Sequence, residues 1–205
     1  MVNLGECTCE AVSGGFPTRR EAHVGASVAC AVWEVRAGVA QENQRHASMT
    51  IGTRASQSCS LAPGWEAAAD RLTSALPKID HIVCSPLGRC RLLAGYLSQR
   101  LTKPVTINED LTEMDFGAWE NTLWDDVPRQ ELDAWADDFY HARPHGGESV
   151  AMLQTRVRRA LKSRPEGAVL WVGHAGLYRS LLAETEHPDP WNAQISFGAF
   201  EILNI

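Results

Sequence analysis

The chain has 205 residues, of which 44% are hydrophobic and 21% are charged, and this composition is typical of a folded globular domain. Its formal net charge of -6 argues against a protein that binds nucleic acid through phosphate contacts, because such contacts need a basic surface. No apolar stretch approaches the roughly 20 residues of a membrane-spanning helix, so we expect no membrane partner.

The first part of the chain differs from the rest. Residues 1–28 are rich in Gly, Ser, Thr and charged side chains, and they show no sustained hydrophobic period. We predict that they form a poorly ordered leader, followed by one domain over residues 29–205. The leader lacks the basic and then apolar regions of a secretory signal, so we expect a cytoplasmic protein.

Short apolar runs predict the β-strands. Such runs, bounded by polar or turn-forming residues, are typical of strands that are buried on both faces of a sheet. The predicted strands are residues 30–35 (CAVWEV), 79–85 (IDHIVCS), a short strand in 103–111 (KPVTINEDL), 167–174 (GAVLWVGH) and 198–205 (GAFEILNI). Because Cys84 falls within the second run, we expect it to be a buried thiol.

Segments with apolar residues at helical spacing separate these strands. The predicted helices are residues 65–76, closed by Pro77, then 85–101, pieces of 120–144 broken at Pro128 and Pro144, 146–164 and 175–184. Strands that alternate with helices predict right-handed crossovers and an α/β fold. We therefore expect a three-layer α/β/α domain with a mostly parallel central sheet.

Three cationic or potentially cationic side chains follow predicted strands. Arg36 comes after the first strand, Arg89 lies just past the second, and His174 ends the strand 167–174. Taken singly, each is explained as a surface charge or a structural histidine. In parallel sheets, however, ligands bind beyond the carboxyl ends of the strands, where these side chains would converge. Their mutual repulsion predicts a bound anion, and the planar guanidinium suits phosphate in particular.

Five segments then carry a resemblance to a known family. They are, in chain order, VWEVRAG, SPLGRCRLLAGYL, LTEMDFGAWEN, GGESV and VLWVGHAGLYRSLL. Together they resemble the motifs of the histidine phosphatase (phosphoglycerate-mutase-like) superfamily over residues 30 to about 185. The stretches MDFGAWEN, ARPHGGES and GHAGLYR are most similar to the α-ribazole phosphatase branch, which works in assembly of the cobalamin nucleotide loop.

The resemblance implies a phosphohistidine mechanism without a metal or organic cofactor. Arg36, Arg89 and His174 would hold the phosphoryl oxygens of a small phosphorylated metabolite. Glu113 would protonate the leaving oxygen and then activate water. Asp115 and Glu120 are near enough in sequence to compete for that role.

The chain departs from the family at the nucleophile, because Ala37 stands where the family has its reactive histidine. A methyl group cannot attack phosphorus, and loss of a nucleophile costs on the order of a millionfold in rate. His46, in a second Arg–His pair, is an alternative, although the polar residues before it do not predict a buried strand. Ala37 has three open explanations: an engineered substitution, a natural pseudoenzyme or a diverged N-terminal region.

Three functions therefore compete. We expect a phosphomonoesterase, with α-ribazole 5'-phosphate as the substrate that the branch suggests and with turnover impaired at Ala37. The alternatives are a non-catalytic phosphate-binding pseudoenzyme and a phosphoglycerate-mutase-like phosphotransferase. Trp119 is a candidate for the substrate pocket, whereas Trp124 and Trp135 are better explained as anchors of amphipathic helices. Cys7 and Cys9 lack a second ligand pair at zinc-site spacing, so we expect no metal.

Overall fold

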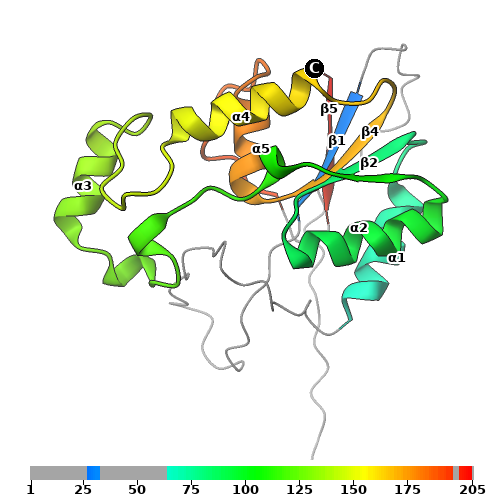
Figure 1. Ribbon diagram of the computed structural model, residues 1–205, viewed down its shortest axis with the longest axis horizontal. Coiled ribbons are helices and arrows are strands. Elements are labelled where there is room, and N and C mark those ends of the chain that lie inside the picture. Colours follow the sequence, from blue (N-terminus) through cyan, green and yellow to red (C-terminus); the bar gives the residue numbers. More distant parts are fainter. Residues whose placement is uncertain (1–26, 33–63, 196–198, 205) are drawn as a thin grey trace, which may run out of the picture.

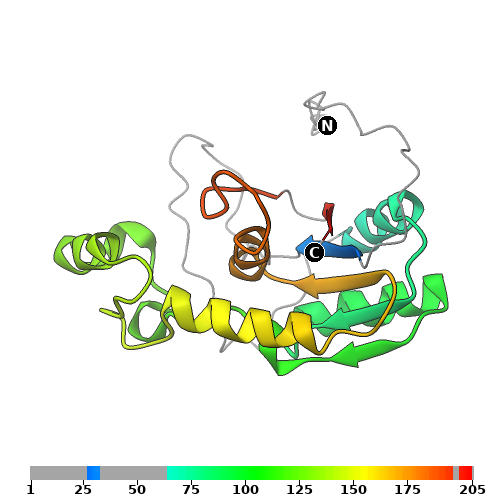
Figure 2. The ribbon, with the colours of Figure 1, turned by 90° about the horizontal axis from the view of Figure 1, so that it is seen from above.

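A five-stranded sheet forms the centre of the molecule (Figures 1 and 2). The computed structural model describes residues 27–32, 64–195 and 199–204. The strands are β1 (Ser27–Val32), β2 (His81–Cys84), β3 (Val105–Ile107), β4 (Val169–Gly173) and β5 (Phe200–Asn204). They lie in the order β3-β2-β4-β1-β5, and every neighbouring pair is parallel except β1 with β5. The predicted mostly parallel sheet is confirmed.

Helices cover both faces of this sheet. The α-helices are α1 (Trp65–Ala75), α2 (Gly88–Leu101), α3 (Arg129–Asp137), α4 (Val150–Lys162) and α5 (Ala175–Leu182). Three short 3-10 helices are η1 (Glu109–Leu111), η2 (Gly117–Trp119) and η3 (Trp124–Asp126). Figure 1 shows α1 and α2 on one side of the sheet, α4 and α5 on the other, and α3 at one end of the molecule.

Side chains alternate along the central strands and build a core on each face. Leu170 and Val172 of β4 join the cluster formed with α1 and α2, whereas Val169 and Trp171 join the cluster formed with α4 and α5. This period of two is the geometry of a strand buried on both sides. The structure therefore has the three layers that the sequence predicts. Cys84 is a fully buried free thiol, as expected.

The first strand differs from its predicted bounds. β1 begins at Ser27, so it includes two residues that the composition assigned to the leader. Ser27 pairs with Asn204 of β5 and Val28 with Val169 of β4, so pairing on both sides, and not the apolar run alone, sets the start of the strand. The described part of β1 ends at Val32, opposite Gly173. Residues 1–26 and 33–63 lie outside the described residues, and so does most of the predicted leader.

Two loops at the end of the molecule near α3 pack backbone against backbone. The Ala118 N–H donates to the His145 carbonyl over 2.9 Å, and the Glu148 N–H donates to the Asp115 carbonyl over 2.7 Å. Gly117 has a positive φ of 49°, and a Cβ at this position would clash with the carbonyl oxygen of His145. Only glycine allows this close approach.

His145 is buried at this junction, 2% exposed. Its Nδ1 accepts the Gly147 N–H over 3.0 Å, so the neutral ring carries its proton on Nε2. The ring centroid lies 4.8 Å from that of Trp119. Burial lowers the pKa of His145, and the Asp115 carboxylate only partly opposes that effect.

This geometry predicts a pH dependence of stability. The unfolded state, in which a histidine has a pKa of about 6.5, binds more protons than the native state. The free energy of unfolding is therefore expected to fall as the pH drops below about 6.5, by up to about 1.4 kcal/mol per pH unit for one proton. In His145→Phe, the part of this change of unfolding free energy with pH that comes from His145 should be absent. Urea unfolding of both proteins between pH 7.5 and pH 5 measures it, and equal slopes would contradict the assignment.

Candidate functional site

The carboxyl ends of β2 and β4 bring two loop-to-helix junctions side by side. Cys84 of β2 lies opposite Val172 of β4, and the Ser85 N–H donates to the Val172 carbonyl over 3.0 Å. After β2 the chain enters α2, whose second residue is Arg89, and after β4 it enters α5, with His174 as the residue before the helix. The parallel pairing therefore places Arg89 and His174 at the same edge of the sheet, as the sequence predicts.

Arg89 and His174 contact each other directly. The Arg89 Nη2 lies 3.0 Å from the His174 Nδ1. A guanidinium only donates, so Nδ1 is the acceptor and the neutral imidazole carries its proton on Nε2. That nitrogen lies 2.8 Å from the Ser85 Oγ, which is placed to accept. Arg89 and Ser85 together fix the orientation and the tautomer of the ring.

Arg89 is a buried cation, 6% exposed. None of the ion pairs in the described part of the chain includes Arg89. Its Nε is buried and has no hydrogen-bond partner there. A buried charge and an unsatisfied donor both cost free energy unless a counter-ion or an acceptor is present. The site therefore favours an anion that accepts hydrogen bonds.

Glu113 reaches the same edge of the sheet from the loop that follows β3 and η1. It is 9% exposed, and its Oε1 accepts the Met114 N–H over 2.8 Å. A Cβ at Gly176 would lie 2.6 Å from that same oxygen. The carboxylate therefore lies against the first turn of α5, which starts directly after His174. The structure thus brings together three of the predicted site residues, Arg89, His174 and Glu113.

The Cys90 thiol packs against the ring of His174. Its Sγ is 3.6 Å from the His174 Nε2 and 3.7 Å from the Gly173 carbonyl oxygen, to which it donates. Burial raises the pKa of Cys90 to about 12, although the charge of Arg89 opposes that effect. A thiol with this pKa stays protonated at neutral pH, so Cys90 packs against the histidine and does not act as a nucleophile.

Trp119 lies at the centre of an aromatic cluster. It is 3% exposed, and its Nε1 donates to the Glu131 Oε2 over 2.7 Å. Its ring centroid lies 6.2 Å from that of Trp124 and 5.9 Å from that of Trp135. Trp119 and Trp124 thus pack against Trp135 of α3, and a role for Trp119 in a substrate pocket stays a prediction.

Arg36, Ala37 and His46 lie outside the described residues. Their predicted roles therefore stay predictions. In the described part, sequence reasoning did not single out Ser85, Cys90 or Gly176 as site residues. The signal for Ser85 was its place directly after a predicted strand within Ser-Pro-Leu-x-Arg, whereas the packing of Cys90 and Gly176 has no signature in sequence.

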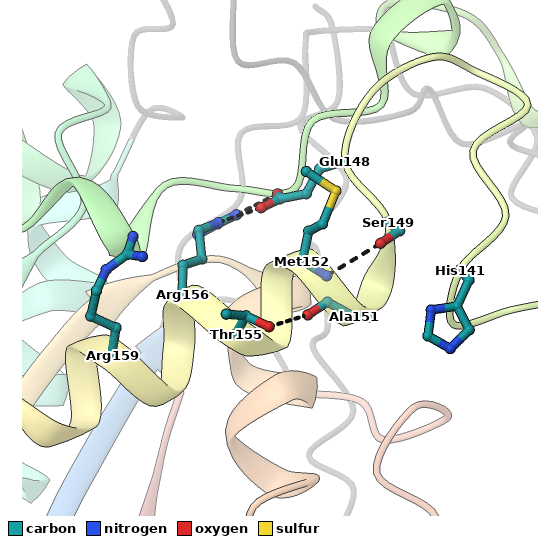
Figure 3. A pocket seen from close by; sticks show the side chains of 8 residues that line it. All are labelled: His141, Glu148, Ser149, Ala151, Met152, Thr155, Arg156 and Arg159. Carbon is teal, nitrogen blue, oxygen red and sulfur yellow. Dashed lines mark hydrogen bonds and ion pairs between the residues drawn. The ribbon is translucent and has the colours of Figure 1, made fainter.

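A separate hollow of about 460 Å³ runs along α4 (Figure 3). His141, Met152 and Arg159 are among its lining residues, and none of Arg89, Glu113 and His174 lines it. Elsewhere in its wall, the Arg156 guanidinium is already paired with the Glu148 carboxylate over 2.7 Å, as Figure 3 shows. The hollow is therefore distinct from the edge that carries the predicted chemistry.

No group of three or more His, Cys, Asp or Glu side chains in residues 27–32, 64–195 and 199–204 is arranged to hold a metal ion. Over the same residues, no helix combines the length and the apolar character that crossing a bilayer requires.

Known proteins are similar to the chain in sequence and in fold. The adenosylcobalamin/alpha-ribazole phosphatase of Escherichia coli strain K12 is 28% identical over 136 residues, which are 62% of this chain and 67% of that protein. A bifunctional protein of Mycobacterium tuberculosis is 34% identical over 111 residues, 51% of this chain and 30% of that protein.

A solved structure, the crystal structure of the alpha-ribazole phosphatase from Shigella flexneri, superposes with a TM-score of 0.67 at 24% identity. The superposition covers 87% of this chain and 90% of that one, and it supports the fold. The sequence profile of the histidine phosphatase superfamily (branch 1) matches residues 35–203. Because this match covers most of the chain, and because Arg89 and His174 lie at the predicted strand ends, the chain belongs to the histidine phosphatase superfamily.

Proposed function

We propose that the chain binds the phosphoryl group of a small phosphorylated metabolite at the edge formed by β2 and β4, as a phosphomonoesterase of the histidine phosphatase type whose turnover is impaired because Ala37 stands at the position of the nucleophile. The observation that carries the proposal is the buried guanidinium of Arg89, which lies 3.0 Å from a neutral histidine and has no ion pair among the described residues. A phosphate dianion would supply the missing charge and the missing acceptors.

His174 would change its hydrogen bonding when an anion binds. Its Nδ1 now accepts from Arg89, whereas a phosphate oxygen can only accept. His174 can therefore donate through Nδ1 only after it takes up a proton or exchanges tautomer. Arg89, released from this contact, would turn both of its terminal nitrogens to the phosphoryl oxygens. Arg36 is expected to complete the set of donors that stabilise the charge in the transition state.

Glu113 would serve the leaving group. Its carboxyl lies against the start of α5, two residues beyond His174, and is largely shielded from water. With a histidine at position 37 to attack phosphorus, such a group would donate a proton to the leaving oxygen as the phosphorus–oxygen bond breaks, and would later take one from the water molecule that hydrolyses the phosphohistidine. Ala37 supplies no nucleophile in this scheme, so the residues that remain bind and orient the ester but do not form a phosphoenzyme.

We further propose α-ribazole 5'-phosphate as the first substrate to test. The resemblance of the motifs to that branch and the name of the Escherichia coli relative both support this choice. Ala37 favours a second function, in which the protein binds a phosphorylated ligand without turning it over.

The first test measures phosphate binding. Inorganic phosphate is expected to bind saturably in isothermal titration calorimetry. Arg89→Ala should raise the Kd for phosphate by about 10- to 150-fold, the range for the loss of a hydrogen bond to a charged group. Arg89→Lys should fall between the two, since it keeps the charge but loses the bidentate geometry. Arg91→Ala, at an exposed position of the same helix, is the control with the same change of charge. An unchanged Kd in Arg89→Ala would exclude this anion site.

The second test restores the nucleophile. The native chain is expected to release phosphate from α-ribazole 5'-phosphate at close to the uncatalysed rate, and Ala37→His should raise that rate by several orders of magnitude. Activity is measured as phosphate release, with 3-phosphoglycerate as the comparison substrate. If Ala37→His leaves both substrates at background, the phosphomonoesterase proposal is wrong and the binding function is favoured. If the native chain is active and His46→Ala abolishes the activity, His46 is the nucleophile.

A further inference from the structure

Gly176 occupies the second position of α5, where the backbone does not require glycine. Positive φ angles in the described residues occur at other glycines, namely Gly64, Gly117, Gly146 and Gly167. In a helix of ordinary conformation, alanine is the better residue because it loses less backbone entropy. What alanine would meet here is a side chain: its Cβ would lie 2.6 Å from the Glu113 Oε1 and 3.6 Å from the Glu113 Cδ.

We infer that Gly176 is the positioning residue for Glu113, because the space left by its missing side chain is the space that the carboxylate occupies beside His174. Glu113 is then held from two sides. The Met114 N–H donates to Oε1 over 2.8 Å, and the open first turn of α5 receives the same oxygen. This inference rests on the proposed role of Glu113 as the proton donor to the leaving group.

The backbone on either side of Glu113 is fixed to α4 and to the segment just before that helix. Arg156 donates from Nη1 to the Asp110 carbonyl over 2.6 Å, before Glu113, and the Glu148 N–H donates to the Asp115 carbonyl over 2.7 Å, after it. Arg156 and Glu148 are themselves joined by two hydrogen bonds of 2.7 and 2.8 Å, which Figure 3 shows as dashed lines. With the loop braced in this way, a Cβ at position 176 displaces the Glu113 side chain, not the loop.

A second glycine provides a matched control. Gly95 lies within α2, and a Cβ built there meets nothing within 4 Å. Gly95→Ala therefore makes the same chemical change in a helix without a steric consequence. Crystal structures of Gly176→Ala and Gly95→Ala are expected to show the Glu113 carboxylate moved away from position 176 in the first, to the 3.4 Å or more of an ordinary van der Waals contact, and unmoved in the second. A Glu113 carboxylate that keeps its place in Gly176→Ala would overturn the inference.

Kinetics in the Ala37→His background give an independent readout. Gly176→Ala should lower kcat by about a hundredfold, since a misplacement of about 1 Å in a reacting group has an effect of this size, and should change KM little. The limb of the pH–rate profile that depends on Glu113 should weaken in parallel. Gly95→Ala should leave kcat, KM and the profile unchanged.

Rescue separates positioning from a merely structural role. Aspartate is one methylene shorter than glutamate, so Glu113→Asp should relieve the clash in Gly176→Ala and make the double variant more active than Gly176→Ala alone. If Gly176→Ala does not fold, its Tm should be recovered by Glu113→Asp, and a double variant that stays unfolded would contradict the inference. If Ala37→His is inactive, the proposed function fails, whereas the crystal structures still decide the role of Gly176.

Discussion

The candidate site depends on the parallel pairing of β2 with β4. The register that sets Cys84 opposite Val172 makes the two strands end at the same level, so Ser85 and Gly173 become neighbours. The helices that follow begin close to the strand ends, α5 one residue after β4 and α2 three residues after β2, which leaves Arg89 and His174 little freedom to lie elsewhere. Their hydrogen bond of 3.0 Å, with Ser85 on the opposite nitrogen of the ring, is the direct result. The sheet thus fixes the place of a buried cation, Arg89.

Glu113 is held in place by other elements than Arg89 and His174. Its loop is held by Arg156 of α4, by Glu148 just before that helix, and by the close backbone contact between the loops that contain Asp115 and His145. The side chains that we propose to bind phosphate and the proposed proton donor are therefore supported by separate elements that meet at the first turn of α5. Substitutions of Arg156 or Glu148 should thus affect the proposed proton transfer more than the proposed anion binding.

The residues proposed to bind the anion do not include the position of Ala37. The proposed anion binding by Arg89 and His174 needs the strand ends and not a nucleophile, so under this proposal the affinity for phosphate does not depend on turnover. Cys90, the one thiol in contact with His174 among the described residues, stays protonated at neutral pH and offers no substitute. Binding of inorganic phosphate and hydrolysis of a phosphate ester can therefore be measured separately, and one can be present without the other.

The sequence by itself determined the fold class and the residues that gather at the edge of the sheet. Buried runs such as 167–174 read directly as central strands because both faces are apolar, and Arg89 and His174 follow two such runs. Glu113 was found from the motif alone, since no periodic pattern places a loop carboxylate. The start of β1 was missed by three residues because its two pairing partners set it.

Only the tertiary structure decided the contacts between elements that are distant in sequence. The tautomer of His174 follows from Arg89, which lies 85 residues away, and the space for Glu113 comes from Gly176 on another helix. Trp119 has the same aromatic ring whether it lines a pocket or a core, and packing against Trp124, Trp135 and His145 buries it. Hydrophobic period records which face of an element is buried, but it holds no information about which side chain of another element will meet it.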